Sequence, residues 1–69
     1  MDLWEFLNYY LDGNITCNIY DIDTEDTLFE GRVYAAIEAL RTDAPVYDIT
    51  SPIEVDEKGV MYIPVETNY

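Results

Sequence analysis

The first apolar residues of the chain recur at the spacing of one helical face. Four of them follow the i, i+3, i+4, i+7 pattern of an amphipathic helix: Leu3, Phe6, Leu7 and Tyr10. Asp2 stands where a side chain can cap the free amides of the first turn. Gly13 follows the last periodic residue, where a left-handed stop is common. The pattern therefore predicts a helix over residues 2–12.

Alternating polar and apolar residues come next, which is the period of a half-buried strand. The apolar members are Ile15, Cys17 and Ile19. A polar turn at 24–27 and an apolar segment at 28–30 predict a short antiparallel return strand, with Gly31 at its end. A helix that starts at Thr24 or Thr27 and runs through Gly31 is the competing interpretation. It is less favoured, because glycine costs about 1 kcal/mol inside a helix.

A second helical stripe begins at Val33. Its members are Val33, Ala36, Ile37 and Leu40. We expect residues 42–45 to end this helix, because the residue before Pro45 avoids helical geometry.

The last third of the chain has the pattern of strands. Residues 46–49 and 53–55 are apolar strand segments, and Pro52 separates them. Residues 56–59 form a hairpin loop in which Gly59 takes a positive φ, and the last strand covers 60–65. Pro64 within that strand favours a sheet edge.

Together these segments predict an α+β fold in the order α-β-β-α-β-β. We expect a small antiparallel sheet of about four strands with two helices packed on it. The 69 residues correspond to a single domain, residues 1–69. A domain near the lower size limit gains stability from further burial, so a homodimer is compatible with this length.

The chain is strongly acidic. It has 15 Asp and Glu against three Lys and Arg, a net charge of −12. Such a surface repels nucleic acid and anionic membranes and attracts basic proteins. Neither a signal peptide nor a membrane-spanning apolar run is recognisable, so the expected location is the cytoplasm. The single cysteine, Cys17, fits a strand pattern and is expected to be a small buried residue.

Catalytic constellations are missing from the sequence. There is no histidine, hence no imidazole base and no Ser-His pair, and no glycine-rich loop that could hold phosphate. We therefore expect a protein that is not an enzyme and that has no cofactor and no metal. Asp21, Asp23 and Glu25 have the spacing of a calcium loop, but Asp26 and Arg32 replace its essential Gly and Glu. A looser carboxylate site for Ca²⁺ or Mg²⁺ is the weaker alternative.

The acidic residues fall into two candidate partner-binding groups. The first comprises Asp21, Asp23, Glu25, Asp26 and Glu30. The second comprises Asp48, Glu54, Asp56 and Glu57. On an extended strand Asp21 and Asp23 would lie on one face about 6.8 Å apart. Regular carboxylates at such spacing resemble the charged backbone of DNA.

These observations predict a non-enzymatic acidic binding protein for a basic partner. A nucleic-acid-binding enzyme is one such partner, whose basic groove a DNA mimic would occupy. The alternative is a small interaction or self-assembling domain whose acidity only keeps it soluble. Its binding surface would be made by exposed tyrosines and apolar edge residues, while other tyrosines, including Tyr10 and Tyr34, are expected to cover the edge of the core. The seven tyrosines are Tyr9, Tyr10, Tyr20, Tyr34, Tyr47, Tyr62 and Tyr69.

Four segments carry a resemblance to known proteins: WEFLNYY, YDIDTEDTLFEG, VYAAIEAL and GVMYIPV. With them the chain resembles the short acidic proteins encoded by prophages and conjugative elements of Gram-positive bacteria. Some small acidic members of such elements inhibit restriction or CRISPR nucleases. The resemblance implies an anti-defence role and assigns no site residues.

Overall fold

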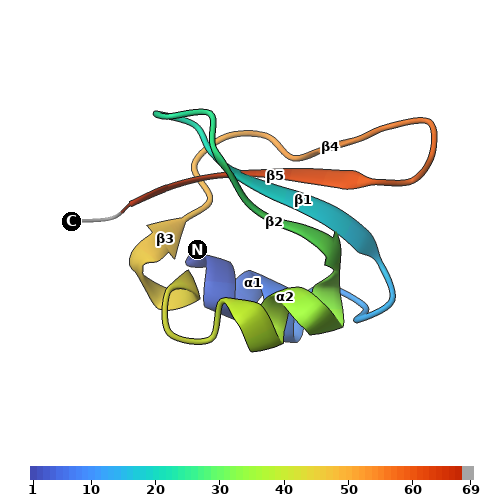
Figure 1. The fold of residues 1–69 in the computed structure, drawn as a ribbon, viewed down its shortest axis with the longest axis horizontal. Helices are drawn as coiled ribbons and strands as arrows, with labels where there is room; N and C mark the ends of the chain where they lie inside the picture. The colour runs from blue at the N-terminus through green and yellow to red at the C-terminus, as the bar shows by residue number, and fades with distance from the viewer. Residues whose placement is uncertain (68–69) are drawn as a thin grey trace.

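The helices pack on one face of a small sheet, which gives the protein two layers (Figure 1). The computed structural model describes residues 1–67. The helices in that range are α1 (Leu3–Tyr9), α2 (Val33–Ala39) and a short 3-10 helix (Ala44–Val46). The strands are β1 (Thr16–Asp21), β2 (Thr27–Arg32), β3 (Tyr47–Asp48), β4 (Glu54–Val55) and β5 (Met61–Thr67). The predicted α+β fold with a small sheet is thereby confirmed.

The strands lie across the sheet in the order β2-β1-β5-β3, and β4 also pairs with β5. β1 is antiparallel to β2 but parallel to β5, in a register from Cys17↔Met61 to Asp21↔Val65. The sheet formed by residues 1–67 is therefore mixed and five-stranded, where an antiparallel sheet of about four strands was expected. The chain passes through α2 between these two strands, and such a crossover lets neighbouring strands run in the same direction.

The N-terminal helix begins as predicted and ends earlier. The Glu5 N–H donates to Asp2 Oδ1 at 2.7 Å, which is the expected cap. The helix ends at Tyr9, and Gly13 does not have the positive φ of a left-handed stop, so that prediction is wrong. Gly13 instead bonds through its backbone to the start of α2. Its carbonyl accepts from the Tyr34 N–H at 3.0 Å, and a Cβ on it would lie 3.4 Å from Tyr34 Cβ.

The return strand is confirmed, and it is longer than expected. β2 continues through Gly31, which has a φ of +151°, and α2 starts directly after Arg32. The helix ends before Pro45 as predicted. Ala44 nevertheless lies in the 3-10 helix, with Pro45 near its start, so the residue before this proline is not extended. Gly59 has the predicted positive φ, +85°.

Pro64 lies inside β5, a central strand, so the prediction of an edge position is wrong. The Ile22 N–H donates to the Val65 carbonyl at 2.9 Å, which directs the backbone groups of Val65 toward β1. Successive residues in a strand alternate, so the backbone of Pro64 points to the other side. There β4 pairs with the start of β5 and β3 with its end. Pro64 falls between them, where its missing N–H breaks no ladder bond.

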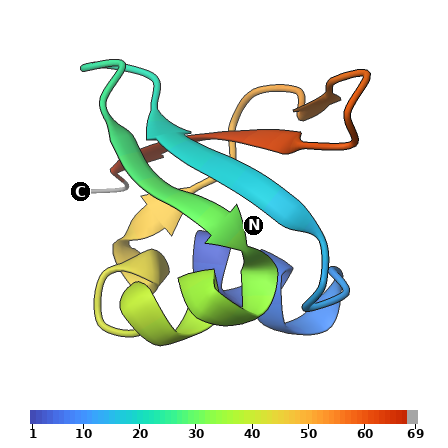
Figure 2. The ribbon, with the colours of Figure 1, turned by 45° about the vertical axis from the view of Figure 1, so that its right-hand side comes forward.

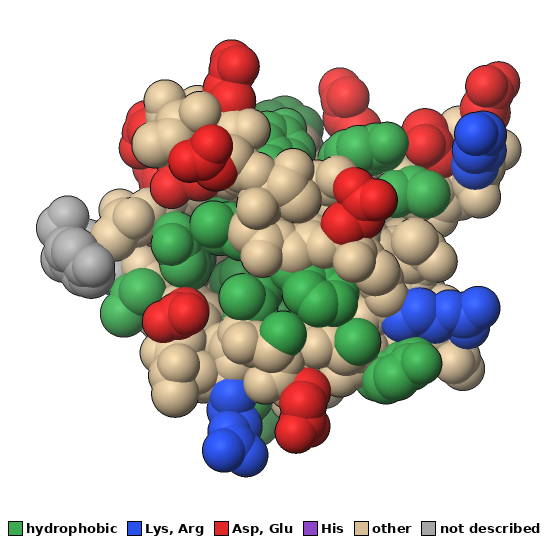
Figure 3. All heavy atoms as spheres, viewed as in Figure 1, with side chains coloured by type: hydrophobic (Ala, Val, Ile, Leu, Met, Phe, Trp, Pro, Cys, Tyr) green, Lys and Arg blue, Asp and Glu red, His purple; other side chains and the backbone are tan. Residues whose placement is uncertain are grey.

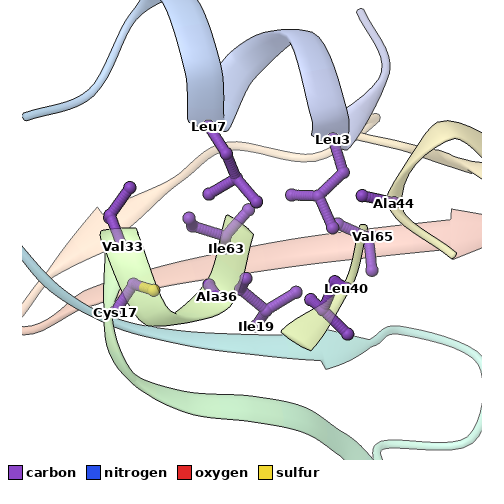
Figure 4. Packing of buried hydrophobic residues seen from close by; sticks show 10 residues of the cluster. All are labelled: Leu3, Leu7, Cys17, Ile19, Val33, Ala36, Leu40, Ala44, Ile63 and Val65. Atoms are coloured by element: carbon purple, nitrogen blue, oxygen red, sulfur yellow. The ribbon is translucent and has the colours of Figure 1, made fainter. Parts of the chain in front are cut away.

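The hydrophobic core fills the space between sheet and helices (Figure 4). Its buried members are Leu3, Leu7, Cys17, Ile19, Val33, Ala36, Leu40, Ala44, Ile63 and Val65. Cys17 is fully buried, as expected, and this burial raises the pKa of its thiol to about 11. Because the helices occupy one face of the sheet, the residues that alternate with the core residues lie on the other face.

Candidate partner-binding surface

The tip of the β1–β2 connection holds four of the predicted carboxylates. These residues, the turn cluster, are Asp21, Asp23, Glu25 and Asp26. Asp21 Oδ1 accepts from the Asp23 N–H at 2.8 Å and from the Thr24 N–H at 3.3 Å. The Asp21 N–H donates to the Asp26 carbonyl at 2.9 Å, which closes the turn. The carboxylates gather at this end of the molecule in the space-filling view (Figure 3).

The predicted strand-like spacing of Asp21 and Asp23 is wrong. β1 ends at Asp21, and Asp23 lies in the turn. The short side chain of Asp21 bonds to the next free amides, as aspartate does at many turns. The DNA-like repeat inferred from these two positions is therefore absent.

A second group of polar side chains crosses the open face of the sheet, the face away from the helices. The register aligns four residues across β2, β1, β5 and β4: Glu30, Asn18, Tyr62 and Glu54. We refer to these four residues as the sheet row. Ile63, the neighbour of Tyr62, is a core residue, so alternation places the row on the other face. Glu30, Glu54 and Tyr62 are exposed there, whereas Pro64 on the same face is buried. Asn18 Nδ2 donates to Glu30 Oε2 at 3.1 Å, which fixes one end of the row.

Asp56 extends the sheet row into the β4–β5 hairpin. Its Oδ1 accepts from the N–H groups of Lys58 and Val60, each at 2.9 Å. Its Oδ2 accepts from the Tyr62 hydroxyl at 3.3 Å. The Val60 N–H and the other donors hold the pKa of Asp56 below its usual value. The negative charge of Asp56 in turn raises the pKa of Tyr62, and Glu30 adds to this effect.

The structure therefore regroups the predicted partner-binding residues. Glu30, predicted in the same group as the turn cluster, lies instead with Glu54 and Asp56 around Tyr62. Asp48 lies elsewhere, in β3 opposite Glu66. Glu57 is exposed in the hairpin.

Asn18 of the sheet row was not predicted as a site residue, and Tyr62 was named only among the tyrosines of the alternative binding surface. Alternation with Cys17 and Ile63 placed both on a polar strand face, and this was the available signal. Only the order of the strands in the sheet shows that Asn18 and Tyr62 lie side by side.

The exposed tyrosines lie mostly on the helical side. Tyr9 is 78% exposed and Tyr10 61% at the end of α1, and Tyr34 is 61% exposed at the start of α2. Tyr10 stacks on Phe6 with ring centroids 6.3 Å apart. The backbone bond from Tyr34 to Gly13 keeps the two helix ends near each other. We call Tyr9, Tyr10 and Tyr34 the tyrosine patch. Tyr69 lies outside the described residues.

The surface formed by residues 1–67 has no enclosed site. It contains no cleft that could surround a small substrate. Within the same residues, no three Asp, Glu, Cys or His side chains are arranged to hold a metal ion, so the calcium alternative has no ligand set there. No helix between residues 1 and 67 has the length and apolarity to cross a membrane.

Comparison of the chain with protein-family models, with curated proteins and with solved structures gave no match.

Proposed function

We propose that the protein acts by binding, and that its open sheet face engages a basic surface of a protein partner. The observation that carries this proposal is the sheet row. Its register brings Glu30, Glu54 and the neighbouring Asp56 around one tyrosine, Tyr62, on the face that the helices leave free.

The geometry of the row suits a flat contact with several cations. Strands lie about 4.8 Å apart, so the backbones of Glu30 and Glu54 are separated by roughly 14 Å, three strand spacings. Tyr62 lies between them and offers a rigid ring at modest entropic cost. Its hydroxyl is already held by Asp56 at 3.3 Å, so the ring is positioned before a partner arrives. Preorganised side chains lose less freedom on binding.

The charge of the whole molecule favours one class of partner. A net charge of −12 attracts basic surfaces from a distance and speeds encounter with them. Proteins that bind nucleic acid present such surfaces, and carboxylates can take the place of phosphates on them. A restriction or CRISPR nuclease is therefore the first partner to test, in keeping with the resemblance to acidic proteins of mobile elements. The encounter would take place in the cytoplasm.

The test compares two variants that remove the same charge from different places. Glu30→Gln with Glu54→Gln neutralises the sheet row. Asp23→Asn with Glu25→Gln removes two of the four charges of the turn cluster and keeps the Asp21 bonds that close the turn. Immobilised protein captures partners from a lysate of the source cells. The bound partners are then released by a salt gradient or by duplex DNA.

The proposal predicts a partner that binds the wild type and the turn variant and is lost from the sheet-row variant. Release by moderate salt and by duplex DNA is expected, because screening and phosphate compete for the same cations. Equal weakening by both variants would show that total charge decides binding. Undiminished binding of the sheet-row variant would exclude the open face as the site.

The tyrosine patch supports a second candidate, an interaction domain that binds through aromatic contacts. The observation in its favour is the exposure of Tyr9 and Tyr34 on adjacent helix ends. Binding through this patch would persist at high salt and would be weakened by Tyr9→Ser with Tyr34→Ser. The same capture experiment therefore separates the two candidates.

A further inference from the structure

β2 is the long unpaired edge of the sheet formed by residues 1–67. It pairs with β1 on one side, and Figure 2 shows no strand on its other side. The opposite edge is short, because β3 and β4 have two residues each. The N-terminal segment also covers β3. Asp2 bridges to Asp48, and the Ile49 N–H donates to the Met1 carbonyl at 3.1 Å.

The backbone groups of Glu30 and Arg32 point outward from this edge. The Val33 N–H donates to the Ile15 carbonyl at 2.9 Å, so Val33 and every second residue before it face β1. Glu30 and Arg32 alternate with those residues. Arg32 is also the N-cap of α2, so its carbonyl accepts the first hydrogen bond of the helix while its N–H faces the edge. The edge therefore offers both N–H groups and the Glu30 carbonyl to another strand.

The side chains on this edge are complementary to themselves in one register. Glu30 and Arg32 are both exposed, and two residues apart in a strand they lie on the same face. If two copies pair antiparallel about a two-fold axis at Gly31, Glu30 of each copy lies opposite Arg32 of the other. If one copy moved by two residues along the other, Glu30 would lie opposite Glu30, or Arg32 opposite Arg32, depending on the direction. Like charges directly opposite destabilise a strand pair.

We propose that two copies of this chain associate through β2 in that register, so that their sheets join and their open faces form one continuous acidic surface. A two-fold axis normal to the sheet keeps both helical layers on one side. The dimer would present two sheet rows side by side. This inference rests on the strand edge and shares Glu30 with the partner-binding proposal; its test measures self-association without a partner, so the two proposals can fail separately.

The association is expected to be weak and reversible. Leu28 is an extra residue in β2, where the register with β1 shifts, and α2 begins at Val33, so the pairing is short. Each copy also carries a charge of −12. Salt at about 0.15 M, where the Debye length is about 8 Å, screens this long-range repulsion but leaves close pairs in contact.

Sedimentation equilibrium of the whole chain at that salt concentration tests the proposal, over a range reaching about 1 mM protein. The wild type is expected to dimerise. Glu30→Arg and Arg32→Glu are each expected to weaken the dimer more than about tenfold, because each turns two attractive pairs into repulsive ones. Circular dichroism verifies that both variants are folded.

Restoration of the dimer gives the sharper result. A mixture of the two single variants is expected to form a heterodimer, because it contains only opposite pairs. The double variant Glu30→Arg with Arg32→Glu is expected to dimerise like the wild type. The proposal is overturned by a wild type that stays monomeric at about 1 mM. In that case the β2 edge would pair only with a different polypeptide. It is also overturned by a dimer that single reversals leave unchanged, or by single variants that neither mixing nor the double exchange restores.

Discussion

Replacement of Gly31 by alanine should destabilise the protein more than any other glycine-to-alanine change in it. Gly31 has a φ of +151°, in a region that side chains disfavour. Occupying such a region costs on the order of 1–3 kcal/mol. A Cβ would also meet the ring of Phe29, with Cε2 at 3.1 Å and Cζ at 3.2 Å. Displacing the ring from its rotamer adds about 1 kcal/mol.

We therefore expect Gly31→Ala to lower the free energy of unfolding by about 2–4 kcal/mol. A chain of 69 residues has a stability of about 3–10 kcal/mol, so this loss is a large fraction of the whole. Urea denaturation followed by circular dichroism measures the change. In a Phe29→Ala background the part due to the ring should disappear and the part due to φ should stay.

Gly13→Ala is the matched control. Gly13 does not have a positive φ, and its Cβ would make an ordinary contact 3.4 Å from Tyr34 Cβ. The change in stability should stay within about 0.5 kcal/mol. If Gly31→Ala were equally mild, the argument from φ and ring contact would be refuted.

Three further changes test other parts of the structure. Asp2→Ala removes the 2.7 Å bond to the Glu5 N–H and should cost about 1 kcal/mol in urea denaturation, whereas Asp2→Asn should cost little; equal losses would contradict capping. The folded-state pKa of Asp56 is lowered, foremost by the Val60 N–H, so its stabilising effect is present above the ordinary pKa and disappears as the pH falls through the folded-state value. Acid titration of Asp56→Asn should therefore show a smaller loss of stability with falling pH than the wild type. A pH profile identical to that of the wild type would contradict this stabilising role of Asp56. The buried Cys17 thiol, with its pKa raised to about 11, should react with a thiol reagent at pH 8 only as fast as the protein opens; rapid labelling of the native state would disprove its burial.

The helices and turns were predictable because neighbouring residues determine them. The helical stripes placed Leu3, Leu7 and Val33 in the core, and the polar residues around Gly59 located the hairpin. An apolar stripe is decided within a few turns of chain. The stop expected at Gly13 was wrong: the helix ends at Tyr9, and Gly13 instead accepts a hydrogen bond from the Tyr34 N–H, in a distant part of the chain.

The sheet topology was not predictable from the same kind of signal. A period of two shows which side chains share a face of a strand, but it does not show which strand lies alongside. The parallel pairing of β1 with β5 joins Asn18 to Tyr62, and no local pattern connects them. The position of Pro64 between β3 and β4 likewise depends on where two short strands end.

For the same reason, the density of acidic residues in the sequence does not show which carboxylates bond to groups within the molecule. Asp21, in the densest acidic segment, uses its carboxylate to bind the amides of its own turn. Asp56 does the same in the β4–β5 hairpin. Glu30 and Glu54 are exposed side chains on strands, and neither closes a turn; within residues 1–67 Glu30 accepts only from the side chain of Asn18. Acidity that shapes the backbone can be distinguished in this way from acidity that is free to meet a partner. Binding experiments should therefore vary Glu30 and Glu54 first and use the turn cluster as the reference.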